Sequence, residues 1–71
     1  MDFSEALLKI KSGERLKREG WNGKNQYIFL YDIGKQDPFW SSYIVIMNEQ
    51  AVKVPWLASQ GDLLAEDWVI A

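Results

Sequence analysis

The feature that most limits the folds open to this chain is its shortness combined with a lack of cross-linking residues. Its 71 residues include no cysteine and no histidine, so disulfides and thiolate or imidazole zinc sites are not available to it. In a domain below about 70–80 residues a single core rarely contributes more than about 3–5 kcal/mol. The chain carries four Trp, three Tyr and three Phe instead. We therefore expect one domain over residues 1–71, a homo-oligomer, and aromatic rings in a subunit interface or a ligand pocket.

The absence of cysteine and histidine also limits the reactions and cofactors open to the chain. Without Cys and His, a Cys–His or Ser–His nucleophile and an imidazole or thiolate haem ligand are excluded. The net charge of −2 argues against binding to DNA or RNA polymers. No apolar run approaches the about 18 residues of a membrane span, and the first residues are acidic rather than signal-like. We expect a soluble protein of the cytoplasm.

The first residues carry the pattern of an amphipathic helix. Asp2 stands at the capping position before it, with Glu5 three residues later. Gly13 is typical of the residue that follows a helix. Apolar residues recur at the spacing of one helix face, at Phe3, Ala6, Leu7 and Ile10.

Four segments after this helix have the character of β-strands, namely residues 14–19, 26–32, 42–48 and 51–54. The first is rich in charge and fits an edge strand. The second is rich in β-branched and aromatic residues, which is typical of a strand buried on both faces. The last two predict a hairpin with a tight turn at Glu49 and Gln50.

The C-terminal part adds a helix and a strand. Ser59 and Asp62 have the spacing of a capping box and predict a helix of one or two turns. Residues 68–70 follow as a short strand, and loops are expected at residues 20–23 and 34–41. This order predicts an α+β fold, in which a small antiparallel sheet carries an N-terminal helix and a short C-terminal helix packed on it.

Carboxylates are the bases that remain for catalysis. Asp62, Glu66 and Asp67 are close in sequence, and Mg²⁺ takes carboxylate and water ligands. Their spacing suits a helix cap and solvent-exposed positions equally well, so it is not diagnostic. We therefore expect no enzyme, no metal ion and no cofactor. The alternative is a metal-dependent phosphodiesterase that uses these three residues.

Two tryptophans favour binding over catalysis. Trp21 lies in a glycine-flanked loop, and Trp56 leads into a helix start whose amides favour an anion. With Arg18 or Lys24 close by, two indoles would suit a nucleotide, through stacking on the base and cations for the phosphates. The alternative is that both indoles are core or interface anchors. Trp68, in the last strand, is expected in the core.

Three runs of the sequence resemble a small family common in phage genomes: DFSEAL (2–7), RxGWNGK (18–24) and VPWLASQxDLLAxDW (54–68). The family is that of the phage anti-Thoeris proteins of the second type. The resemblance implies a sponge that binds cyclic ADP-ribose isomers made by TIR-domain enzymes and holds them without cleaving them. Some relatives also resemble sponges for cyclic dinucleotides or trinucleotides, which are held at a separate site.

The resemblance also implies a homotetramer of the host cytoplasm, with ligand pockets between protomers. It assigns Trp21 and Trp56 as walls that stack on the ligand. Four residues are then expected to contact its ribose and phosphates, namely Asn22, Ser59, Gln60 and Asp62. Tyr27 and Phe29 alternate on the strand after the Trp21 loop, so only one is expected to face the pocket. A structural or protein-interaction module, whose tryptophans join subunits, is the third interpretation.

Overall fold

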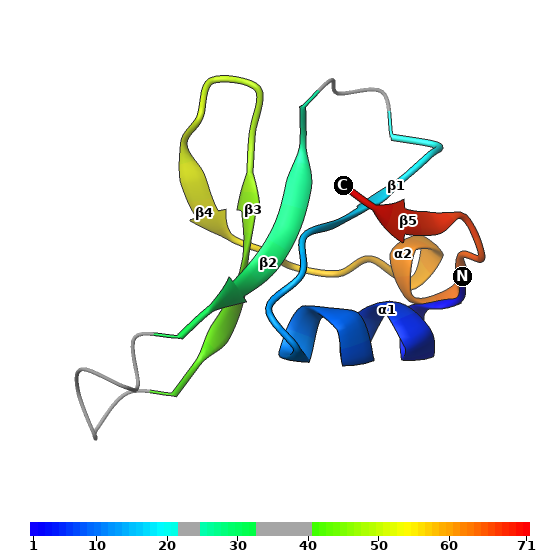
Figure 1. The fold of residues 1–71 in the computed structure, drawn as a ribbon. Coiled ribbons are helices and arrows are strands. Elements are labelled where there is room, and N and C mark those ends of the chain that lie inside the picture. Colours follow the sequence, from blue (N-terminus) through cyan, green and yellow to red (C-terminus); the bar gives the residue numbers. More distant parts are fainter. Residues whose placement is uncertain (22–24, 33–40) are drawn as a thin grey trace.

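The computed structural model describes residues 1–21, 25–32 and 41–71, which form the helices and strands in the predicted order (Figure 1). In chain order these are α1 (Phe3–Lys11), β1 (Leu16–Arg18), β2 (Tyr27–Tyr31), β3 (Tyr43–Met47), β4 (Lys53–Pro55), α2 (Gln60–Leu64) and β5 (Trp68–Ile70). The strands form one antiparallel sheet in the order β4-β3-β2-β1-β5. The α+β prediction is confirmed. Residues 34–40 of the loop expected at 34–41, including Trp40, and residues 22 and 23 of the loop expected at 20–23 lie outside the described residues.

Helix α1 forms where the sequence predicts it. The Asp2 side chain accepts a hydrogen bond from the Glu5 amide at 3.0 Å and caps the first turn. Gly13, at φ +100°, takes the left-handed backbone that ends the helix without steric strain. Ala6 and Ile10 are fully buried, so the predicted apolar face of α1 packs on the sheet. In the described ranges, no helix is long and apolar enough to cross a membrane.

Strand β1 is an inner strand, so the prediction of an edge strand at residues 14–19 is wrong. Leu16 lies opposite Ile28 of β2 on one side and Ile70 of β5 on the other. The physical reason is that β5 returns from the far end of the chain to pair with β1. Local charge cannot indicate such a pairing. The charges instead follow the strand alternation, with Leu16 buried and Lys17 exposed.

The sequence suggested that strand β2 is buried on both faces, and the structure shows that it is not. Of its five residues Ile28 alone is fully buried, and the others are half-buried. Ile28 and Leu30 belong to the core side of the sheet. Tyr27 and Phe29 alternate with them and therefore lie on the opposite face. A strand with apolar residues at every position can still have one face without a helix on it.

Strands β3 and β4 form the predicted hairpin, but with a longer connection. Met47 pairs with Lys53, so residues 48–52 join the strands, and β4 begins two residues later than predicted. The Asn48 side chain accepts hydrogen bonds from the amides of Gln50 and Val52 at 2.9 and 3.0 Å. Ala51 takes a φ of +60°. The asparagine therefore organises this turn by bonding the backbone beyond it.

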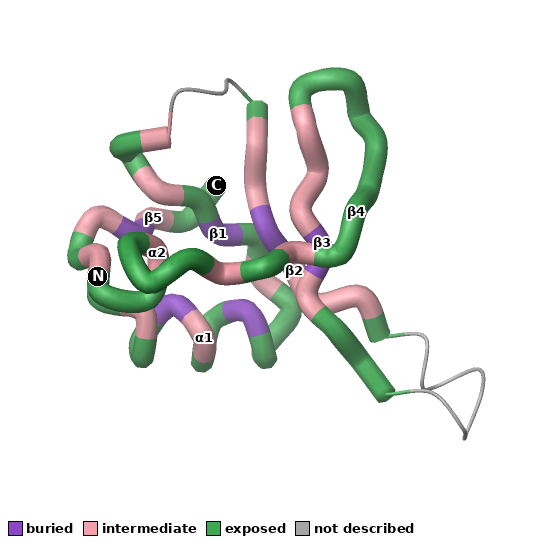
Figure 2. The backbone as a smooth tube through the Cα atoms, turned by 180° about the vertical axis from the view of Figure 1, so that it is seen from behind, coloured by how far each residue is buried: buried purple, intermediate pink, exposed green. Residues whose placement is uncertain are grey.

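The core lies between the helices and one face of the sheet. Its fully buried members come from α1, β1, β2 and β5, and are Ala6, Ile10, Leu16, Ile28 and Trp68. Figure 2 shows buried positions on these elements and on β3, whereas β4 is exposed throughout. The prediction that Trp68 belongs to the core is confirmed. Both helices lie on this side (Figure 1), and the other side of the sheet carries no helix of the described chain.

Candidate functional site

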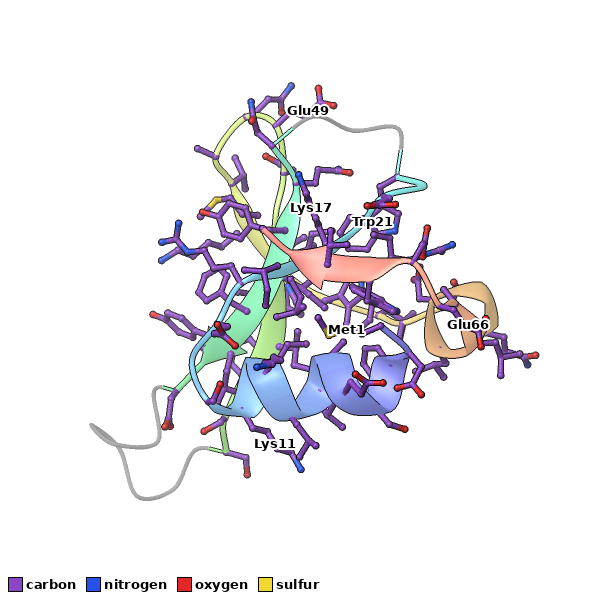
Figure 3. The ribbon with its side chains drawn as sticks, turned by 45° about the vertical axis from the view of Figure 1, so that its right-hand side comes forward. Met1, Lys11, Lys17, Trp21, Glu49 and Glu66 are labelled. Carbon is purple, nitrogen blue, oxygen red and sulfur yellow. The ribbon has the colours of Figure 1, made fainter. Side chains whose placement is uncertain are left out.

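Three tryptophans meet where the two helices join the sheet. The buried ring of Trp68 has the ring of Trp21 at 5.4 Å between centroids and that of Trp56 at 5.9 Å, with interplanar angles of 79° and 88°. Phe3 packs on Trp68 at 5.3 Å and on Trp56 at 5.9 Å. Figure 3 shows Trp21 next to β5. Trp21 and Trp56 are half-buried, so each has one part in the core and another part in solvent. We call Phe3, Trp21, Trp56 and Trp68 the tryptophan cluster.

Trp56 lies between the end of β4 and the cap of α2. The Trp56 amide donates to the carbonyl of Ile44 at 2.9 Å, which continues the pairing of β4 with β3. Ser59 then caps α2 by accepting from the Asp62 amide at 3.0 Å and donating its own amide to the Asp62 carboxylate at 3.1 Å. The predicted capping box is confirmed. The helix has five residues, and the negative charge at its first turn comes from Asp62 itself.

Arg18 forms ion pairs with two carboxylates instead of facing an open site. Its Nε donates to Asp67 Oδ1 at 2.8 Å, and its Nη1 donates to Asp62 Oδ1 at 3.0 Å. The side chains of Arg18, Asp62 and Asp67 are 24%, 13% and 32% exposed. The guanidinium that the sequence suggested for a phosphate is therefore already neutralised within the protein.

These contacts shift the pKa values of the three groups. The hydrogen bond from Arg18, opposed by some desolvation, lowers the pKa of Asp67 below its ordinary value. Burial raises the pKa of Asp62, but hydrogen bonds from Ser59 and Arg18 outweigh it and leave that pKa lowered. The bonds to Asp67 and Asp62 in turn raise the pKa of Arg18. All three groups are therefore charged at neutral pH.

The lowered carboxylate pKa values predict a loss of stability in acid. The unfolded chain binds protons near the ordinary value of 3.8, at which the folded carboxylates are still ionised. The stabilisation is therefore fully present above about pH 5 and is lost as the pH falls below 3.8 toward the folded values. Thermal melts between neutral pH and about pH 3 should show this decline, and Asp67→Asn should weaken the dependence. An equal slope for that variant would contradict the assignment.

The carboxylates Asp62, Glu66 and Asp67 do not make a metal site. Arg18 binds the carboxylates of both Asp62 and Asp67. Among residues 1–21, 25–32 and 41–71, no three acidic side chains are placed to hold a metal ion. The phosphodiesterase alternative therefore loses the metal centre that the sequence suggested for it.

Tyr27 and Phe29 both lie on the side of the sheet without a helix. Their ring centroids are 5.8 Å apart, so the prediction that only one of them can face a given site is wrong. The physical reason is the strand period of two, which places residues i and i+2 on the same face. The next alternate residue, Tyr31, contacts Tyr43 of β3 at 5.7 Å. We call the surface formed by these four rings the aromatic face.

Two cationic side chains make cation–π contacts with rings of the aromatic face. The guanidinium of Arg15 lies 4.8 Å from the centre of the Tyr27 ring, and the Lys53 ammonium lies 5.3 Å from that of Tyr31. A hollow of about 180 Å³ opens here, lined by Tyr31, Tyr43, Val45, Lys53, Val54 and Pro55. Sequence reasoning missed this surface, although aromatic residues at every second position of residues 27–31 were the signal for it.

The structure thus separates the expected ligand residues into two groups. One group gathers around the start of α2 and the tryptophan cluster, namely Trp21, Trp56, Ser59, Gln60 and Asp62. The other, Tyr27 and Phe29, lies on the opposite face of the sheet, and Asn22 lies outside the described residues. Sequence reasoning did not find the ion pair of Arg18 with Asp67, because the two residues are 49 positions apart.

The chain matches known proteins along its whole length. Residues 1–71 match the model of the Thoeris anti-defense 2-like domain. A curated protein named Thoeris anti-defense 2, from Bacillus phage SP01, is 36% identical over 83 residues, which cover 99% of this chain and 93% of that protein. The similarity therefore includes the segments that carry the tryptophan cluster and those that carry the aromatic face.

Proposed function

Because the chain belongs to the Thoeris anti-defense 2-like family, we propose that it is a phage protein that blocks Thoeris defence by binding a cyclic ADP-ribose-type signal and holding it uncleaved. Membership over residues 1–71 is the observation that carries the anti-Thoeris role. The finer statement, that the chain is a sponge and not an enzyme, is supported by the tryptophan cluster. Its aromatic rings pack on one another beside the cap of α2.

The packing of the tryptophan cluster favours tight binding. Trp21 and Trp56 each contact the buried Trp68, so little freedom remains to be lost when a planar ligand stacks on their exposed parts. A sponge must bind at nanomolar concentration, which corresponds to about −12 kcal/mol. An enclosed, aromatic-lined pocket reaches this affinity without any reacting group.

We propose further that the pocket is completed by other copies of the chain, in a homotetramer. The aromatic face supports this, since a contiguous apolar surface rimmed by charge is typical of subunit interfaces. In such an assembly Tyr27 and Phe29 reach a ligand only from a neighbouring copy, because in one protomer they face away from the tryptophan cluster.

Release of the bound ligand tests this function. The protein is incubated with a panel of cyclic ADP-ribose isomers and cyclic di- and trinucleotides, filtered, and denatured, and the released nucleotide is identified by mass spectrometry. We expect an intact cyclic ADP-ribose isomer and a higher melting temperature, since ligand at 100 times its Kd stabilises a protein by about 2.7 kcal/mol. A linear product would show a phosphodiesterase. If no nucleotide were retained and none raised the melting temperature, the protein would be a structural module.

A further inference from the structure

Asp67 binds the three residues that precede Trp21. Its Oδ1 accepts from Arg18 Nε at 2.8 Å, its Oδ2 accepts from the Gly20 amide at 2.9 Å, and its carbonyl accepts from the Glu19 amide at 3.1 Å. The next residue in the chain is Trp68, the centre of the tryptophan cluster. The position of Trp21 relative to Trp68 is therefore determined by a carboxylate as well as by the ring contact.

Asp62 connects the same segment to α2. Its Oδ1 accepts from Arg18 Nη1 at 3.0 Å and from Trp21 Nε1 at 3.4 Å. Its other oxygen accepts from the Ser59 amide in the helix cap. The indole hydrogen bond is long, and such bonds are weak by themselves. The shorter bond from Arg18 holds the carboxylate where the indole reaches it.

Gly20 is needed for this arrangement. A Cβ atom built on Gly20 would lie 2.9 Å from Asp67 Oδ2, closer than a real side chain approaches. The absence of a side chain lets the carboxylate lie against the backbone and accept its N–H. Arg18 is needed for a different reason, because the guanidinium presents two N–H groups in a fixed fork to two carboxylates. A lysine ammonium has no such fork.

From these contacts we propose that Arg18, Gly20 and Asp67 form a positioning network for Trp21, which sets ligand affinity although none of the three touches the ligand. The assignment rests on the proposed function, since it concerns the same site. The network fixes the Trp21 indole relative to the segment that leads from Trp56 into α2. Around metal sites, supporting groups one step removed from the bound ion change affinity by about 10- to 100-fold when they are altered, and we expect an effect of this size here, since binding sites generally depend on such support.

The test compares Arg18→Lys and Gly20→Ala with the unchanged chain and with Asp2→Ala, which removes the α1 cap away from this network. The affinity for the retained cyclic ADP-ribose isomer is measured by calorimetry, and the Trp21 indole N–H resonance by NMR. We expect both network variants to bind about 10- to 100-fold more weakly and to shift that resonance without ligand. Asp2→Ala should lower the melting temperature and leave the affinity and the resonance unchanged.

Each outcome is decisive. Wild-type affinity and an unmoved Trp21 resonance in Arg18→Lys would overturn the positioning role and leave the proposed function intact. Weaker binding with an unmoved resonance would also overturn it, because Arg18 would then act by direct contact. If the unchanged chain retained no nucleotide, the proposed function would fail, and the Trp21 resonance would still decide whether the network positions this ring. Should Gly20→Ala not fold, Arg18→Lys alone decides.

Discussion

Trp68→Ala should abolish folding of the isolated domain. The Trp68 side chain is fully buried and contacts the rings of Phe3, Trp21 and Trp56. Replacing a buried Trp with Ala destabilises a protein by about 3–5 kcal/mol, which equals the whole contribution expected from the core of a domain this small. Far-UV circular dichroism and urea titration of the variant measure the effect directly.

Leu64→Ala is the matched control for this substitution. Leu64 is 80% exposed, and changes at such surface positions are usually within about 0.5 kcal/mol. The control should therefore unfold at nearly the same urea concentration as the unchanged chain. A folded Trp68→Ala protein with a cooperative transition would show that the tryptophan cluster is not the centre of stability.

Phe29→Glu should convert the proposed tetramer into monomers. The substitution places a carboxylate at the centre of the aromatic face, where burial against another copy would leave it desolvated. In the single protomer the new carboxylate is tolerated, because the Lys53 ammonium lies 6.0 Å from the present Phe29 ring and supplies a counter-charge. Analytical ultracentrifugation gives the mass of the assembly, and circular dichroism checks that the fold remains.

Leu8→Glu provides the comparison at an unrelated surface. Leu8 is on α1 and is 68% exposed, whereas the aromatic face lies on the side of the sheet without a helix. The assembly should keep its mass in this variant. If Phe29→Glu also kept the mass, the aromatic face would not be the surface that joins the copies.

Whether a feature could be predicted from the sequence depends on the sequence separation of the residues whose contacts determine it. The helix α1 was predicted because its cap at Asp2 and its apolar spacing lie within ten residues. The capping box of Ser59 and Asp62 was predicted for the same reason. The inner position of β1 was not predicted, because it depends on the pairing of β1 with β5. The charged residues of β1, taken alone, are typical of an edge strand.

The candidate site shows the same limit. Trp21 and Trp56 are brought together by Trp68, whose ring contacts both of theirs. The sequence predicted Trp68 in the core but not its contact with the other two rings. The ion pair of Arg18 with Asp67 joins residues 49 positions apart and has no local signal. The arrangement of Tyr27 and Phe29, in contrast, followed from strand alternation, and was mispredicted by an incorrect use of that rule.

The pairing of β5 with β1 has a consequence for the order in which the domain can form. Neighbouring strands β2, β3 and β4 meet through short or moderate chain separations, whereas Arg18 faces Trp68 only after some fifty residues of chain have been brought into a closed loop. Closing long loops before their contacts form slows folding. We therefore expect β2, β3 and β4 to pair first, and the tryptophan cluster to assemble late, together with the ion pairs around it.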